Sequence, residues 1–207
     1  MDVMALARAE RSDLADFLSA LAPRQWESPT LCTGWTVRDV VAHIVSYEEH
    51  GPADLLERLR RVRFRPQRLN EAALADYRGK SPDELLEFLR THLEPRGSTA
   101  RFGGRVGLVD CLIHHQDIRR PLGMPRDVPA DRLAVALPFA VWAPPLRGFW
   151  KARGARLVAT DLDWAHGRGP EARGPAEAVL LALAGRGDAA AGLTGPGARI
   201  LQDRLGR

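Results

Sequence analysis

Cysteine is scarce in this chain, and its scarcity excludes several classes of site. Cys32 and Cys111 are the only two cysteines in 207 residues. They lack the C-x-x-C spacing of zinc and redox motifs, and two cysteines do not make a disulfide framework. Cys111 lies in an apolar segment, where a free cysteine is expected to be a core residue. Cys32 precedes an expected helix start, and a nucleophilic role would require a lowered thiol pKa, which the sequence does not indicate.

Long hydrophobic runs are also missing. No apolar run approaches the roughly 20 residues that cross a bilayer, and the opening segment Met1–Arg11 is interrupted by charge and does not have the hydrophobic centre of a signal peptide. We therefore expect a cytoplasmic protein with no membrane partner. With 45% hydrophobic and 27% charged residues, the composition is that of a globular protein that can bury a core.

Lysine is nearly absent, because all but Lys80 and Lys151 of the 30 basic residues are arginines. Such a bias follows from a GC-rich coding sequence and is weak evidence about partners. The densest run, Arg58–Arg68, could bind nucleic acid or an anionic ligand, although a solvated helix end and loop is the simpler interpretation. No helix-turn-helix, zinc-finger or aromatic–basic RNA signature accompanies it, so nucleic acid is not an expected partner.

Helical periodicity dominates the first 126 residues. Apolar spacing predicts a helix over residues 2–22 that Pro23 ends, then a loop to residue 35, then a helix that Thr36 caps. Ser81 and Pro82 begin a third helix. A fourth, over residues 106–122, is apolar nearly all round and is expected to be central. Four such helices predict an antiparallel bundle.

The pattern changes after about Arg126. A helix is expected over Leu133–Val141, interrupted by Pro138. Two short β-like runs follow, at 156–160 and 163–166, and then an Ala/Leu-rich helix to residue 183 and a last apolar segment at 200–205. The sequence therefore predicts a mainly α protein, with a helical bundle in residues 1–126 and a small α+β domain in residues 127–207.

The informative chemical feature is Asp110-x-x-x-His114. Residues four apart lie on one helical face, so both side chains can reach one point. A carboxylate in so apolar a helix is costly unless a cation or a hydrogen-bond donor meets it. A divalent ion would meet both side chains, whereas an Asp–His hydrogen bond or a pairing with an arginine is the simpler alternative. Asp117, one turn further on, could orient a ligand histidine.

His43 interrupts the apolar segment Val40–Val45 of the second helix. Alone, it could be a satisfied core histidine. Together with Asp110 and His114 it supplies two imidazoles and one carboxylate, the ligand set of a catalytic zinc site with an open position. Zinc is favoured, and iron, nickel and manganese also suit these donors. Such an ion would lower the pKa of a bound water or thiol.

The remaining histidines are weaker candidates. His115 points about 100° away from His114 by the helical period and should not share its ion. His50 and His92 fall near expected helix ends, where exposure to solvent is the default. His166 belongs to the C-terminal domain.

Three stretches carry a resemblance to a known family. The segments CTGWTVRDVVAHIV (Cys32–Val45), GLVDCLIHHQDIRRPLG (Gly107–Gly123) and VATDLDW…RGPAEAVLLALAGR (Val158–Arg186) together resemble the mycothiol-dependent maleylpyruvate isomerase family. The resemblance covers nearly the whole chain. It implies a DinB-like four-helix metal bundle joined to a small C-terminal α+β domain that resembles a sterol-carrier fold.

The resemblance also implies site residues. The metal ligands of the family are a histidine, here His43, and a Glu-x-x-x-His pair, here Asp110 and His114. Aspartate in place of glutamate is a departure, and its shorter side chain must bring the backbone nearer the ion or bind through water. An arginine of the C-terminal domain is implied for an anionic substrate, and Arg186 is the best positional candidate.

The function implied by the resemblance is metal-dependent chemistry with mycothiol, or a similar low-molecular-weight thiol, as cosubstrate. A thiol and a small electrophilic, anionic substrate would be its partners, and S-transfer or cis–trans isomerisation its reaction. Arg119 and Arg120 could also fix carboxylates. The chain is expected to be a monomer or a homodimer. The alternative from a different class is a catalytically silent metal- or ligand-binding bundle with a regulatory or binding role.

Overall fold

The computed structural model describes residues 1–48, 60, 74, 76–77 and 79–206. The chain divides into two compact units, Met1–Arg126 and Asp127–Arg207. His50 and the arginine-rich run, apart from the exposed Arg60, lie outside the described residues. Among the described residues, every helix is either too short or too polar to cross a membrane.

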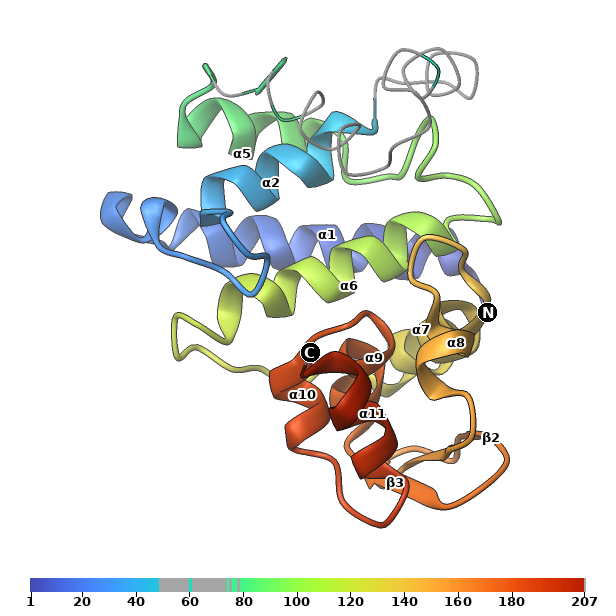
Figure 1. Cartoon of the computed structure of the whole chain (residues 1–207). Helices are drawn as coiled ribbons and strands as arrows, with labels where there is room; N and C mark the ends of the chain where they lie inside the picture. Colours follow the sequence, from blue (N-terminus) through green and yellow to red (C-terminus); the bar gives the residue numbers. More distant parts are fainter. Residues whose placement is uncertain (49–59, 61–73, 75, 78, 207) are drawn as a thin grey trace. The chain divides into compact units, whose positions relative to one another are not determined.

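The N-terminal unit is a bundle of helices. Helix α1 packs along α6, and α2 packs against both α5 and α6 (Figure 1). The bounds of these helices are α1 Val3–Ser19, α2 Val37–Ser46, α5 Pro82–Thr91 and α6 Arg105–Arg119. The mainly helical fold predicted from the apolar spacing is confirmed, and α6, apolar nearly all round, contacts both α1 and α2.

Two capping boxes explain where α2 and α5 begin. The Thr36 Oγ1 accepts a hydrogen bond from the Asp39 backbone N–H at 3.2 Å, and the Asp39 carboxylate accepts one from the Thr36 N–H at 2.9 Å. Ser81 and Glu84 repeat this arrangement at α5. Each box satisfies backbone donors that a helix start leaves without partners. The first box fixes the register of the helix that carries His43.

The segment between α1 and α2 is more ordered than the predicted loop. It contains a 3₁₀ helix, η1 Pro23–Glu27, and an antiparallel bridge between Pro29 and Thr36. The Leu31 N–H donates to the Asp117 carbonyl of α6 at 3.1 Å. This segment is therefore hydrogen-bonded to the helix that carries Asp110 and His114.

The C-terminal unit combines helices with a small mixed sheet. Its helices are α7 Ala130–Trp142, α8 Gly148–Ala152, α9 Ala176–Leu183, α10 Gly187–Ala191 and α11 Ala198–Leu205. Strand β1 Arg156–Ala159 is central, antiparallel to β2 Ala165–Gly167 and parallel to β3 Glu171–Gly174. The two predicted β-like runs correspond to β1 and β2.

Three sequence expectations for this unit need correction. Pro138 lies within α7 and does not interrupt it. Pro138 is exposed, whereas its neighbours Leu137 and Ala140 are buried in the helix that packs on α9. The backbone hydrogen bond that proline cannot make is therefore lost on the exposed side of the helix. Strand β3 was not predicted, because it has only four residues and two of them are charged. Its pairing with β1 is what makes this segment a strand. The short helices α8 and α10 carry too little periodicity to be predicted.

Candidate metal centre

His43, Asp110 and His114 converge in the N-terminal unit. The Asp110 Oδ1 lies 3.7 Å from the His43 Nε2 and 3.6 Å from the His114 Nε2. One ligand atom from each residue lies within 4.8 Å of the other two. The structure therefore brings together the three side chains that the sequence singled out, one from α2 and two from α6.

These separations fit a small divalent cation. Ions bound at about 2.0–2.2 Å by nitrogen and oxygen donors hold neighbouring tetrahedral ligand atoms about 3.3–3.5 Å apart. Two of the measured separations exceed that range by only a few tenths of an ångström. The side chains of His43 and His114 are 8% and 11% exposed, whereas that of Asp110 is 26% exposed. The cluster is thus accessible to a small molecule beside the carboxylate.

Asp117 determines which nitrogen of His114 faces this cluster. Its Oδ2 lies 2.9 Å from the His114 Nδ1, and its side chain is fully buried. With Nδ1–H donated to a carboxylate, the Nε2 lone pair is directed to the side where Asp110 and His43 lie. A histidine that binds a metal through one nitrogen usually donates its other N–H in this way. The orienting position predicted for Asp117 agrees with this geometry.

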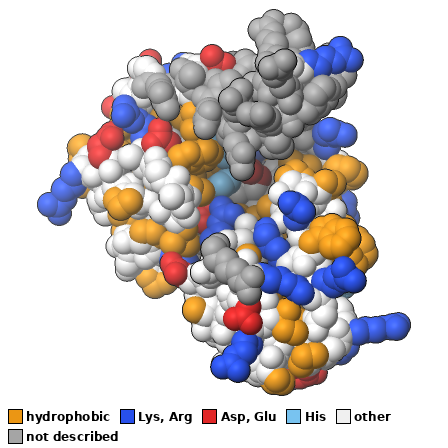
Figure 2. All heavy atoms as spheres, viewed as in Figure 1, with side chains coloured by type: hydrophobic (Ala, Val, Ile, Leu, Met, Phe, Trp, Pro, Cys, Tyr) orange, Lys and Arg blue, Asp and Glu red, His pale blue; other side chains and the backbone are white. Residues whose placement is uncertain are grey.

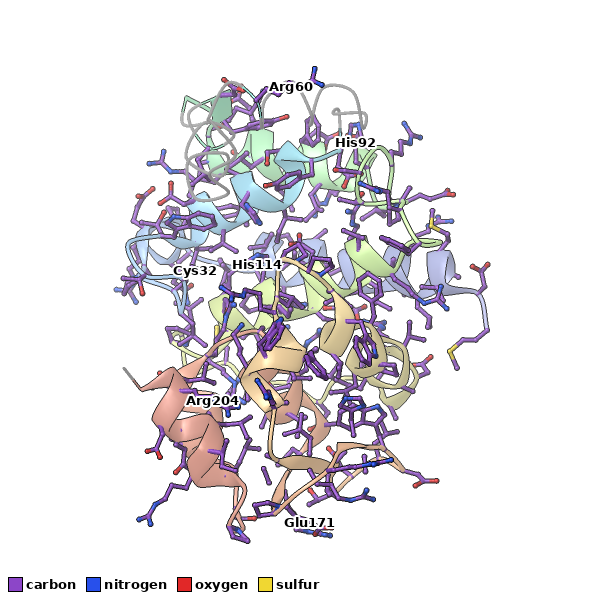
Figure 3. The ribbon with its side chains drawn as sticks, turned by 45° about the vertical axis from the view of Figure 1, so that its right-hand side comes forward. Cys32, Arg60, His92, His114, Glu171 and Arg204 are labelled. Carbon is purple, nitrogen blue, oxygen red and sulfur yellow. The ribbon has the colours of Figure 1, made fainter. Side chains whose placement is uncertain are left out.

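Cys32 is the residue that the sequence reasoning missed. Its thiol donates to the Asp117 Oδ2 at 3.2 Å and lies 3.7 Å from the His114 Nδ1. Figure 3 shows Cys32 and His114 side by side. Cys32, His114 and Asp117 form a second group of possible metal ligands. No pattern in the sequence signals this position, because it depends on the hydrogen bond between the Cys32 segment and α6.

The segment before α2 holds Cys32 in place through backbone contacts. The Cys32 N–H donates to the Thr30 Oγ1 at 3.2 Å, and that hydroxyl donates to the Trp35 carbonyl at 3.0 Å. The Leu31–Asp117 backbone hydrogen bond attaches the same segment to α6. Cys32 is half-buried and Cys111, as expected, is buried. Burial raises the pKa of the Cys111 thiol well above its ordinary value, so this residue stays a neutral core residue.

The electrostatics of the cluster favour a carboxylate beside a cation. Burial alone would raise the pKa of Asp110, but the charge of His114 and a hydrogen bond from His43 outweigh it and hold that pKa below its usual range. Burial likewise opposes the charged form of His114, yet Asp110 and Asp117 together raise its pKa to about 10. Two carboxylates therefore stabilise positive charge at this point, whether a proton or a metal ion carries it.

Aromatic rings surround His43. The ring centroids of Trp35 and Tyr47 lie 5.1 and 5.2 Å from that of His43, and the His114 ring meets it edge-on at 4.8 Å. These contacts restrict the rotation of the imidazole. A restricted imidazole pays less conformational entropy when it binds a ligand.

The other sequence candidates lie elsewhere. His115 is buried and contacts Glu10 instead of the cluster, as its helical angle predicted. Arg119, a candidate for carboxylate binding, donates to the His115 Nε2 at 2.8 Å and stacks on Phe17, so it takes part in the packing of the bundle. His92 is half-buried instead of exposed, because it stacks on Phe88 at 4.2 Å.

Three further sequence candidates are not among the three metal ligands. Arg120 caps α6 and is half-buried. Arg186 caps α10 in the C-terminal unit, and its Nη1 donates to the Ala184 carbonyl at 2.8 Å. His166 lies on β2 of the same unit. The substrate-binding role of Arg186 stays a prediction.

Comparisons with known proteins agree with the fold. The chain is similar to the crystal structure of a histidine-to-alanine mutant of mycothiol-dependent maleylpyruvate isomerase, with a TM-score of 0.60, 17% identity, and coverage of 94% of this chain and 91% of that one. The crystal structure of mycothiol-dependent maleylpyruvate isomerase gives a TM-score of 0.55 at 14% identity, with the same coverage. At such identity the likeness shows a common fold.

The sequence comparison is more specific. No curated protein matches the chain. Residues 7–101 match the family described as the mycothiol maleylpyruvate isomerase N-terminal domain. This segment contains Cys32 and His43, and it ends before the helix that carries Asp110 and His114. By this match, the N-terminal part of the chain is similar to the mycothiol maleylpyruvate isomerase N-terminal domain family.

Proposed function

We propose that the N-terminal unit holds one divalent metal ion, zinc in the first place, through His43, Asp110 and His114. The observation that carries the proposal is the convergence of three donor atoms, with the opposite nitrogen of His114 hydrogen-bonded to a buried carboxylate. Two histidines and one carboxylate leave a fourth position for an exogenous ligand. We further propose that this ligand is a low-molecular-weight thiol such as mycothiol, because the structural relatives are mycothiol-dependent.

The chain's own residues would each have a distinct task. With an ion in place of the proton, His43 and His114 would present neutral imidazole nitrogens, and Asp110 would supply the negative charge. The His114 Nδ1 would still donate to Asp117 and leave Nε2 for the ion. The bound ion would supply Lewis acidity, lowering the pKa of the coordinated thiol so that a thiolate exists near neutral pH.

The reaction we propose is addition of that thiolate to a small electrophilic, anionic substrate. Addition to a conjugated alkene would form a carbon–sulfur bond and move the alkene electron pair into an enolate, which leaves a single bond that can rotate. Return of that electron pair would re-form the double bond and expel the thiolate, giving the other isomer. Where water protonates the enolate first, the sulfur stays on the substrate and the outcome is S-transfer. Arg186 is the proposed carboxylate-binding residue, because the guanidinium fork matches a carboxylate.

A second candidate function is metal or ligand binding without catalysis. The carboxylate here is an aspartate where the resemblance leads us to expect glutamate, and the sequence identity to the structural relatives is only 14–17%. A catalytically silent bundle that binds a metal or a ligand would have the same three donors. Metal binding is common to both candidates, so only a turnover measurement separates them.

The first experiment measures metal content and affinity of the full chain. We expect one ion per chain for the wild type, and at least about a hundredfold weaker affinity for His43→Ala and Asp110→Ala, since each removes a direct ligand. His92→Ala is the matched control and should bind normally, because His92 stacks on Phe88. Equal affinity in all four proteins would refute the metal centre.

The second experiment measures turnover by the metal-loaded protein. Mycothiol is supplied with maleylpyruvate, epoxides or activated alkenes, and products or adducts are followed by mass spectrometry. Thiol-dependent product that is lost in Asp110→Ala supports the enzyme. Stoichiometric metal without any product across these substrates supports the silent bundle instead.

A further inference from the structure

The C-terminal unit contains a cavity that the proposed metal chemistry does not use. It has a volume of about 410 Å³ and is lined by α7, α8, the turn after α8, and β2. Its principal side chains are those of Trp142, Phe149, Arg153, His166 and Arg168. This volume lies within the range of about 300–1,000 Å³ that is typical of small-molecule sites.

Aromatic rings form the walls of this cavity. Trp142 and Phe149 stack nearly parallel, with centroids 5.3 Å apart and planes at 17°. His166 meets Trp142 edge-on at 5.9 Å. Trp142 is 64% exposed and Phe149 39% exposed. These two rings therefore offer aromatic surface that a ligand could cover.

The rim of the cavity is cationic. Arg153 and Arg168 are both exposed, and the nine residues that line the cavity include no aspartate or glutamate. In Figure 2, orange hydrophobic side chains of this unit lie among blue Lys and Arg side chains. Flat apolar walls beside guanidinium groups suit a ligand that is itself flat and negatively charged.

We propose that this cavity binds a small planar aromatic carboxylate. The ring of the ligand would lie against the stacked Trp142–Phe149 pair, and its carboxylate would accept hydrogen bonds from Arg168, since the Arg153 guanidinium lies over the Trp150 ring at 5.9 Å. The stacked pair is already formed, so little ordering is required on binding. This site is a second one, separate in its residues and in its chemistry from the three metal ligands.

The test uses naphthoate as the probe and ¹⁵N-labelled full-length protein. The indole N–H signals of the tryptophans are followed by NMR during the titration. We expect the Trp142 signal to shift saturably and the Trp35 signal to stay constant. Because Trp35 lies 5.1 Å from His43, its indole reports any binding of the carboxylate at the metal centre instead.

Three variants and one neutral probe make the result decisive. Affinities of the variants are measured by isothermal titration, because Trp142→Ala removes the NMR reporter. Trp142→Ala should weaken binding by about tenfold, and Arg168→Gln, a surface change that keeps the fold, by about threefold to tenfold. Naphthylmethanol, which has no carboxylate, should bind about tenfold more weakly than naphthoate. Phe102→Ala is the control, since Phe102 is a 62% exposed ring of the N-terminal unit that does not line the cavity.

Several results would overturn the proposal. The proposed site would be refuted if the Trp142 signal does not shift, or if the Trp35 signal shifts in its place. Equal weakening by Trp142→Ala and Phe102→Ala would show unspecific attachment to exposed rings and refute the site. Equal affinity for the two probes, or no effect of Arg168→Gln, would remove the carboxylate from the proposal.

Discussion

Helix α6 carries two adjacent histidines whose surroundings are opposite in charge. His114 faces Asp110 and Asp117, and these carboxylates raise its pKa to about 10 although burial opposes the charge. His115 is fully buried on another face of the helix, where burial first and Arg126 next lower its pKa to about 4. Adjacent positions on α6 therefore differ in effect: the surroundings of His114 favour a protonated imidazole, and those of His115 favour a neutral one.

The face around His115 is a network of hydrogen bonds and ion pairs. Arg119 donates to the His115 Nε2 at 2.8 Å, so the Nδ1–H donates to the Glu10 carboxylate at 2.9 Å. Glu10 also pairs with Arg126, and Arg126 lies 3.6 Å from Asp13. Apart from the Arg119–His115 contact, which lies within α6, these contacts join α1 to α6 and to Arg126. A neutral imidazole fits between an arginine and a carboxylate without any additional ion.

The face around His114 has the opposite balance. Two carboxylates and one further imidazole surround it, and the cluster is partly open at Asp110. The negative charge there is balanced by a proton or by a metal ion. The comparison teaches that burial of a histidine does not distinguish a packing role from a ligand role. The charges that surround each imidazole make that distinction.

The largest effect we expect is on stability, from Glu10→Gln. The glutamine keeps an acceptor for the His115 N–H but leaves the buried Arg126 without its main anionic partner, which should cost about 3–5 kcal/mol of unfolding free energy. Urea denaturation measures it. Asp13→Asn, at a carboxylate that is 46% exposed, is the matched control and should cost less than about 1 kcal/mol. Metal affinity should be unchanged in both variants. A loss of metal binding in Glu10→Gln would show that the His115 and His114 faces of α6 do not act independently.

The next effect is a loss of stability in acid that depends on His115. The folded pKa, about 4, lies below the ordinary value of 6.5, so the unfolded chain binds a proton first as the pH falls. Stability that is fully present above pH 6.5 should therefore decline towards pH 4, by about 3 kcal/mol for this group. Denaturation of the wild type and His115→Gln at pH 7 and at pH 4.5 measures the difference. Parallel losses in the two proteins would contradict the assignment of the titration to His115.

Asp117→Asn should act on the metal face alone. The amide oxygen can still accept from the His114 N–H, but the charge is lost and the amide can rotate, so metal affinity should fall about ten- to hundredfold. Isothermal titration of the metal-free protein with zinc measures the change. Cys32→Ser, which keeps a donor to Asp117, should bind zinc within about threefold of the wild type. If Cys32→Ser weakens zinc as strongly as Asp117→Asn, the thiol itself belongs to the ligand set.

Sequence reasoning predicted the parts of this protein that local rules determine. Capping residues such as Thr36 and Ser81 located helix starts, and the four-residue spacing placed Asp110 and His114 on one face. The position of Cys32 depends on a loop that hydrogen-bonds to α6, and no periodicity encodes it. The same holds for β3, which exists only by pairing with β1. Contacts between distant segments were the part that could not be predicted.

The smallest effect we expect comes from Asp110→Glu, which restores the residue type that the resemblance implies. The carboxylate oxygen of Asp110 already lies 3.6 and 3.7 Å from the two imidazole nitrogens, so the shorter side chain reaches the ion position from this backbone. Zinc affinity should consequently change by less than about tenfold, or 1.4 kcal/mol. Competition with a chromophoric chelator measures it, with Asp110→Asn as the comparison that removes charge at constant length. A gain well above tenfold in Asp110→Glu would mean that the aspartate does not reach the ion, and that it serves mainly to balance the charge of a protonated His114.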